Sequence, residues 1–188
     1  MFEVLPQLPA DPILGLSTAF KADPNPLKID LGVGVYKDEN GRTPILNSIA
    51  KAQRILLDTE DSKTYITPQG VQGYIDGLTE LLLGKGNKAV LENRVAGVQA
   101  PGGCGALRIL SELIKRCKSD TTVWVSDPTW ANHIPLIGNA GLKIETYPYF
   151  DKAQASIRFD AMVECLQNVK AGDVVLLDGC CHNPTGAD

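Results

Sequence analysis

The sequence predicts an α/β fold in which a mostly parallel sheet is flanked by helices. After Asn93, strand-like, loop and helix-like segments follow one another in the order typical of parallel βαβ units. A glycine-rich turn at 101–105 stands at one such strand-to-helix junction. The apolar run at 174–177 indicates a buried strand, and a polar turn follows it. Ligands bind beyond the carboxyl ends of the strands in open α/β sheets, so these loops are the candidate binding region.

The composition limits the class of protein. A chain of 188 residues that is 44% apolar is long enough for one domain with a hydrophobic core. The net charge is −4 and the basic residues are scattered, which argues against nucleic acid or a membrane surface as a partner. No signal-peptide pattern and no apolar run of membrane-spanning length occurs, so we expect a cytoplasmic protein.

The five cysteines favour reduced thiols over a disulfide framework. Their number is odd, no CxxC pair occurs, and the adjacent Cys180 and Cys181 are poor partners for each other. A zinc site made by these two residues and His182 is disfavoured, because neighbouring side chains diverge instead of converging on one tetrahedron. We therefore expect no metal site.

The N-terminal part is predicted to begin with an extended arm and to continue with two helices. Five prolines in the first thirty residues punctuate the arm, which we expect to lie on a larger body or on a partner. Residues 29–36 alternate like a strand, and Gly32 and Gly34 within them indicate either close approach of a ligand or a bulge without function. Helical spacing follows at 44–57 and 71–83, and the loop between these helices carries Tyr65, a packing residue more often than a ligand.

The remaining elements follow from periodicity and turn signals. Asp160 is expected to N-cap the last helix. Strands are predicted at 94–99, 122–126, 142–147 and 174–177, and helices at 106–114, 132–139 and 161–169.

Three loops at the expected carboxyl edge carry candidate binding groups. Gly103 lies in the glycine-rich turn, where backbone N–H groups and the helix dipole favour phosphate; the turn matches neither the dinucleotide fingerprint nor a Walker loop. Trp130, with His133 three residues on, could stack on a flat cofactor, and packing is the alternative. Asn183, beside His182, would offer an amide N–H to a ring oxygen, and an ordinary turn is the alternative. The Asn183-Pro184 bond can be cis. Together these groups predict a pocket for a planar, phosphorylated ring.

Four motifs in register make the prediction specific. They are Ile29–Asp38, Pro101–Leu107, Trp124–His133 and Cys180–Gly186. The sequence resembles the aspartate and aromatic amino-acid aminotransferases, which are class I pyridoxal-phosphate enzymes, and the likeness covers nearly the whole chain. It implies the large domain of a fold type I aminotransferase and pyridoxal 5′-phosphate as the cofactor.

The resemblance also implies roles for individual residues. Gly103 and Cys104 would hold the cofactor phosphate, Trp130 would stack on the pyridine ring, and Asn183 would bond the ring hydroxyl and approach the substrate carboxylate. Trp130 would also line the substrate side. A thiol at Cys104 departs from the hydroxyl usual in the family, and it donates only weakly.

Further implied roles lie around these contacts. Gly34 would touch substrate from a mobile lid. Tyr65 would reach the phosphate in the other subunit, which implies a homodimer with shared active sites. His133 would support, from behind, the acid that pairs with the pyridinium nitrogen, and His182 is assigned to the same supporting layer.

The resemblance places the family's Schiff-base lysine, pyridinium-pairing aspartate and carboxylate-clamping arginines at positions beyond Asp188. We therefore expect an N-terminal portion, inactive alone, with residues 1–40 as an arm and small-domain segment and 41–188 as part of the cofactor-binding large domain. The implied activity moves an amino group between aspartate or an aromatic amino acid and 2-oxoglutarate. The alternative is a non-catalytic fragment that keeps only a phosphate and cofactor cradle.

Overall fold

The computed structural model describes residues 3, 12–30, 32 and 34–187. The chain divides into two compact units, residues 1–64 and 65–188, and each is described here by itself. Much of the predicted N-terminal arm falls on residues 4–11, which lie outside the described residues. The predicted domain boundary after residue 40 stays a prediction.

Within its described residues, the first unit holds helices α1 (Pro12–Ala22) and α2 (Asn47–Thr59). Pro12 opens α1, where a missing N–H costs little. At the other end the Lys28 ammonium donates to the carbonyls of Phe20 at 2.6 Å and Asp23 at 2.8 Å, which satisfies acceptors that the last turn leaves open. Part of the predicted extended arm is therefore helical, which corrects the prediction.

Two predictions of extended structure are wrong. The described residues of 29–36, and all of 94–99, lie outside any strand. A strand needs a neighbour for its backbone hydrogen bonds. Here the Gln99 N–H donates instead to the carbonyl of Gln69 at 2.8 Å, and the Gly32 N–H donates to a carboxylate oxygen of Asp30 at 3.0 Å. Alternation of side chains along the sequence does not supply the missing neighbour.

The second unit contains the predicted parallel sheet, which confirms the α/β fold. Its strands are β1 (Thr122–Asp127), β2 (Lys143–Pro148) and β5 (Val174–Val175), in the order β2-β1-β5. Both pairings of β1 are parallel, so the carboxyl ends of the three strands share one edge. Among the described residues, β5 pairs with β1 alone.

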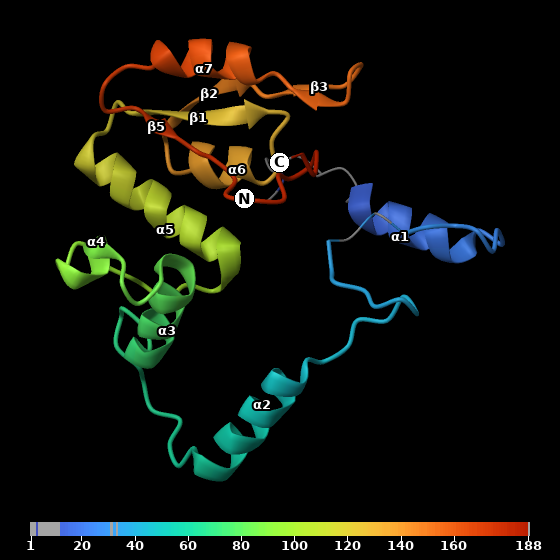
Figure 1. The fold of residues 1–188 in the computed structure, drawn as a ribbon, viewed down its shortest axis with the longest axis vertical. Helices are drawn as coiled ribbons and strands as arrows, with labels where there is room; N and C mark the ends of the chain where they lie inside the picture. Colours follow the sequence, from blue (N-terminus) through green and yellow to red (C-terminus); the bar gives the residue numbers. More distant parts are fainter. Residues whose placement is uncertain (1–2, 4–11, 31, 33, 188) are drawn as a thin grey trace. The chain divides into compact units, whose positions relative to one another are not determined.

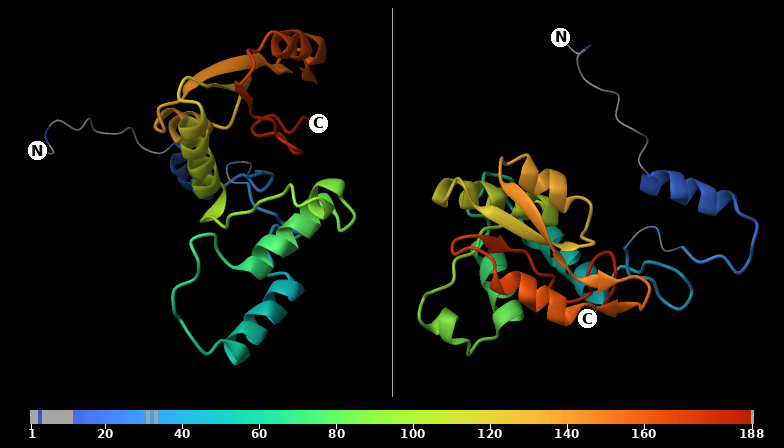
Figure 2. Two further views of the ribbon diagram at one scale, coloured as in Figure 1. Left: turned by 90° about the vertical axis from the view of Figure 1, so that its left-hand side faces the viewer. Right: turned by 90° about the horizontal axis from the view of Figure 1, so that it is seen from above.

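Helices cover both faces of this sheet. Figure 1 shows α7 (Phe159–Gln167) above the sheet and α6 (His133–Gly138) and α5 (Gly102–Cys117) below it. In the view from above in Figure 2, α7 again lies on the opposite side of the strands from α5 and α6. The buried apolar core lies between the sheet and the lower helices and consists of Val123, Val125, Ile137 and Leu142. An apolar groove of about 220 Å³ separates α5 from β5 and is lined by residues that include Leu107, Leu110, Ile114, Val175 and Leu177.

Smaller elements complete the second unit. Helix α3 (Gln72–Leu83) ends at Gly84, whose φ of 80° suits glycine. Helix α4 (Lys88–Leu91) and the antiparallel pair β3 (Phe150–Asp151) and β4 (Ser156–Ile157) are too short for a periodic signal and were not predicted.

The prediction that Asp160 caps α7 is wrong. The N-cap residue is Arg158, and Asp160 lies inside the first turn of the helix. An acidic side chain there still faces the positive end of the helix dipole. The sequence signal therefore marked the correct helix end, with the position shifted by two residues.

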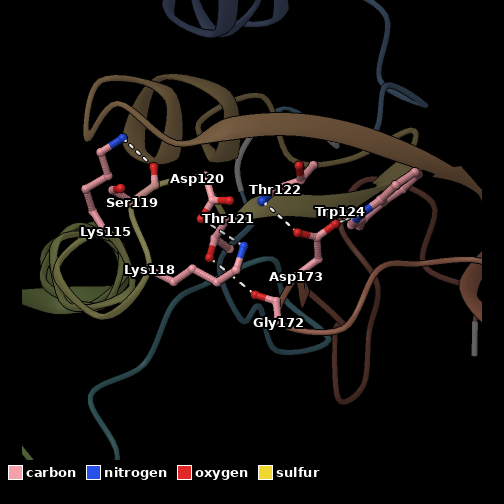
Figure 3. Close-up of polar contacts among 9 residues, drawn as sticks. All are labelled: Lys115, Lys118, Ser119, Asp120, Thr121, Thr122, Trp124, Gly172 and Asp173. Atoms are coloured by element: carbon pink, nitrogen blue, oxygen red, sulfur yellow. Dashed lines mark hydrogen bonds and ion pairs between the residues drawn. The ribbon is translucent and has the colours of Figure 1, made fainter.

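A polar network ties the amino edge of the sheet together (Figure 3). The Asp173 carboxylate accepts from the Thr122 N–H at 3.0 Å and from the Trp124 indole N–H at 3.3 Å, which joins β5 to β1. The Lys115 ammonium, in the last turns of α5, donates to the carbonyls of Ser119 at 2.8 Å and Gly141 at 2.6 Å. The C-terminal end of α5 is thereby fixed at the amino edge.

The Asp173 contacts predict a loss of stability in acid. The Thr122 N–H, above all, holds the pKa of Asp173 below its usual value. The ionised form therefore stabilises the fold above the unfolded-state pKa, and that contribution is lost as the pH falls through the lowered pKa. We expect urea unfolding to show a smaller stability difference between the native protein and Asp173→Asn at pH 3 than at pH 7. An equal difference at both pH values would contradict the assignment.

Candidate functional site

Two loops leave the carboxyl edge of the sheet side by side. The loop after β1 carries Trp130 and leads into α6, which begins at His133. The loop after β5 carries His182 and Asn183. Because β1 and β5 are adjacent and parallel, both loops start from the same edge. The structure therefore brings these four predicted residues to one edge of the sheet.

A buried imidazole locks the second loop to the first strand. His182 is 4% exposed, and its Nε2 pairs with the hydroxyl of Ser126, 2% exposed, at 2.8 Å. Its Nδ1 pairs with the Thr185 hydroxyl at 2.8 Å, and its ring stacks on Tyr149 with 4.0 Å between centroids. With both nitrogens and one ring face engaged, the His182 side chain is held in one orientation.

Asn183 follows this anchor directly. Its backbone N–H donates to a carboxylate oxygen of Asp178 at 2.9 Å, which closes the loop that contains the exposed Cys180 and Cys181. The peptide bond to Pro184 is cis, as the sequence allowed. The Asn183 side chain is exposed, so its amide group lies on the surface of the loop, where a ligand can reach it.

Trp130 and His133 form a unit at the end of β1. The two rings meet edge to face, with 5.3 Å between centroids and 88° between planes. The backbone N–H of His133 donates to the Trp130 carbonyl at 2.9 Å. The ring Nδ1 of His133 pairs with the Thr129 hydroxyl at 2.8 Å. Trp130 is half-buried and His133 is 7% exposed, so the imidazole fixes the position of the indole.

The protonation of His133 depends on its surroundings. Burial lowers the pKa of His133, which favours the neutral ring. The Asp178 carboxylate raises the pKa of His133 and His182 lowers it, and both effects are smaller than that of burial. Burial also raises the pKa of Tyr147, whose hydroxyl donates to the Leu176 carbonyl at 2.9 Å. Burial thus favours the neutral forms of His133 and Tyr147 at this edge.

The glycine turn begins α5. Gly102 has φ 69°, and Gly103 and Cys104 lie exposed in the first helical turn. No side chain caps this end, and no acidic residue lies in its first turn. A Cβ added at Gly103 would meet nothing within 4 Å. The backbone N–H groups and the positive end of the dipole are therefore open to an anion.

The direction of α5 brings this turn toward the same side of the sheet. The helix is about 24 Å long, and β1 spans roughly 20 Å. Since the C-terminal end of α5 is fixed at the amino edge, its first turn points to the carboxyl side (Figure 1).

Two further predicted residues lie on other segments of the chain. Tyr65 is fully exposed in the loop before α3. Gly34 belongs to the first unit and is exposed. Their roles stay predictions.

Several residues of the site were missed by sequence reasoning. Ser126 and Asp178 lie within a few residues of strand ends, so the rule that found Trp130 and Asn183 could have found them as well. Tyr149 carries no such signal, because only the folded chain stacks it on His182.

Within the described residues, no group of three or more potential ligands is arranged to hold a metal ion. No helix in the described part of the chain is both long and apolar enough to cross a bilayer.

Comparison with known proteins gives one consistent result. The family model for aminotransferase class I and II matches residues 26–188. The chain is 46% identical over 188 residues to an aspartate aminotransferase of Escherichia coli, covering 100% of this chain and 48% of that protein. It is also 46% identical to a tyrosine aminotransferase of Rhizobium meliloti, covering 99% and 47%. The chain thus spans about half the length of the curated relatives it matches.

Solved structures agree. An aromatic-amino-acid aminotransferase from Burkholderia pseudomallei, covalently bound to pyridoxal phosphate, superposes with a TM-score of 0.94 at 38% identity, covering 100% of this chain and 47% of the other. An aspartate aminotransferase from the cytoplasm of Saccharomyces cerevisiae gives 0.90 at 32% identity, covering 100% and 46%. The resemblance drawn from the four motifs is confirmed.

Proposed function

Because the chain belongs to the class I and II aminotransferases, we propose that it forms the cofactor-cradling part of a cytoplasmic enzyme that uses pyridoxal phosphate. That enzyme moves an amino group between aspartate or an aromatic amino acid and 2-oxoglutarate. The observation that carries the proposal is the pair of loops joined by Ser126 and His182, which presents an indole and an amide at one sheet edge.

The described residues fit this cofactor. The open N–H groups at Gly103 and Cys104 would take the phosphate, and the weak donor at Cys104 matters little where backbone N–H groups bind. The Trp130 indole would lie against the ring, and the Asn183 amide would donate to the ring oxygen. When bound, pyridoxal phosphate supplies an electron-withdrawing ring that stabilises negative charge at the substrate Cα.

His133 would act from behind the ring. Its Nδ1 pairs with Thr129 at 2.8 Å, and burial lowers the pKa of His133, which favours the neutral imidazole. A neutral imidazole offers one donor and one acceptor nitrogen. We assign Nε2 to an acid that pairs with the pyridine nitrogen, so that His133 holds that acid in position.

We propose a homodimer with shared sites. The support is the exposure of Tyr65, whose hydroxyl stands clear of its own unit and could reach a phosphate held by a second copy. On the substrate side, Gly34 and Asn183 complete the proposed contacts. Both residues are exposed, as substrate contacts must be before the ligand binds.

The two tryptophans provide a direct test of cofactor binding. In Trp124→Phe, the remaining indole at residue 130 should lose fluorescence saturably as pyridoxal phosphate is added. Pyridoxal without the phosphate should bind roughly 100-fold more weakly, since charge-assisted hydrogen bonds to the phosphate are lost. Amino transfer from aspartate, tyrosine or phenylalanine to 2-oxoglutarate should be measurable in the enzyme of which this chain forms a part, and sedimentation of that enzyme should give a dimer. Equal affinity for both compounds would overturn the proposed cradle.

A further inference from the structure

We infer that Asp178 is a positioning residue of this edge: its carboxylate closes the turn that follows β5 and so holds the backbone of Asn183 in place. The inference rests on the proposed function only where it concerns the contact between Asn183 and the cofactor. The anchoring itself is a property of the folded chain.

The anchoring is seen in the geometry. One Asp178 carboxylate oxygen lies 2.9 Å from the backbone nitrogen of Asn183, five residues further along. This bond closes the loop from one side, and the bonds of His182 to Ser126 and Thr185 hold it from the other. A bond from an N–H to a carboxylate is stronger than one to a neutral acceptor. Asp178 thus limits the motion of the Asn183 backbone, from which the side-chain amide extends.

The charge of Asp178 reaches a second functional residue. The carboxylate raises the pKa of His133, against the effect of burial, and it also raises the pKa of the buried Tyr147 hydroxyl. The other groups that face this region are His182, which disfavours a charged His133, and Tyr149, which stacks on His182. A second carboxylate, that of the exposed Asp127, ends β1 at the same edge.

Two substitutions separate the hydrogen bond from the charge. Asp178→Asn keeps an oxygen that can accept from the Asn183 N–H but removes the charge, whereas Asp178→Ala removes both. Asp173→Asn is the matched control, because it makes the same chemical change at the amino end of β5. Since an asparagine before Gly179 can lose its amide, intact mass must confirm the Asp178→Asn protein before use.

Hydrogen exchange measured by NMR, in protein without cofactor, tests the anchoring, and titration of the His133 imidazole reports separately on the Asp178 charge. We expect the Asn183 amide to exchange at least roughly tenfold faster in Asp178→Ala and much less so in Asp178→Asn. The chain has two histidines, so the His133 ring is readily followed. In Asp178→Asn the pKa of His133 should fall further, because the opposing charge is gone, whereas Asp173→Asn should leave that pKa unchanged.

The opposite outcomes are equally clear. Unchanged exchange at Asn183 in Asp178→Ala, or equally fast exchange in Asp178→Ala and Asp173→Asn, overturns the anchoring. A general loss of structure would speed exchange equally in Asp178→Ala, Asp178→Asn and Asp173→Asn. It would not change the pKa of His133 in Asp178→Asn, which keeps the hydrogen bond. Pyridoxal phosphate should bind roughly tenfold more weakly to Asp178→Ala. If the native protein bound none, the proposed function would fail while the NMR results still decided the role of Asp178.

Discussion

Replacing His182 with alanine should lower the free energy of unfolding of the second unit by about 3 kcal/mol. The change removes hydrogen bonds to Ser126 and Thr185, at about 1 kcal/mol each, and a stacked contact with Tyr149 of similar size. The Ser126 hydroxyl, 2% exposed, would also lose its imidazole partner. Urea unfolding measures the loss.

A double-mutant cycle serves as the control for this result. Ser126→Ala alone should cost about 1 kcal/mol, and the cycle with His182→Ala should return a coupling energy of the same order. A loss of less than about 0.5 kcal/mol on replacing His182, as expected for a surface residue, would show that the two loops are not joined through this ring.

Replacing Trp130 with alanine should weaken the binding of pyridoxal phosphate roughly 30-fold, since stacking a flat ring on an aromatic side chain contributes about 2 kcal/mol. The indole is half-buried and held by His133, so it is already in position before a ligand arrives. Equilibrium dialysis against the cofactor measures the change without relying on tryptophan fluorescence.

Two matched variants complete this test. Trp130→Phe keeps an aromatic face and should lose only about threefold in affinity. Trp124→Phe changes the other indole, which lies in β1 and bonds Asp173 at the amino edge, and it should bind as the native protein does. Comparable losses in Trp124→Phe and Trp130→Ala would mean that the effect comes from the sheet and not from stacking.

The sequence predicted the sheet where local pattern and tertiary pairing agree. The residues at 122–125 form an unbroken run of β-branched and aromatic side chains, and the folded strand buries Val123 and Val125. Residues 94–99 are also predicted as a strand, but they find no strand partner among the described residues. A strand is a property of two segments, whereas the sequence of one segment shows only half of it.

The site shows the same division. Trp130, His182 and Asn183 could be predicted because each follows a strand end, where the rule for open α/β sheets places ligands. The contacts that fix these residues could not be predicted, because they join positions far apart in the chain. Ser126 and His182 are separated by 56 positions, and the stacking of Tyr149 on His182 depends on how β2 continues past the sheet.

The groove between α5 and β5 has a practical consequence for anyone handling this chain. One side of β5 presents backbone groups and apolar side chains next to Leu110, which is 51% exposed, and Leu177, which is 63% exposed. Such an edge accepts any extended segment that offers a row of aliphatic groups. Resistance to aggregation will therefore depend on whether an extended segment covers β5, and dilute samples should aggregate more slowly than concentrated ones.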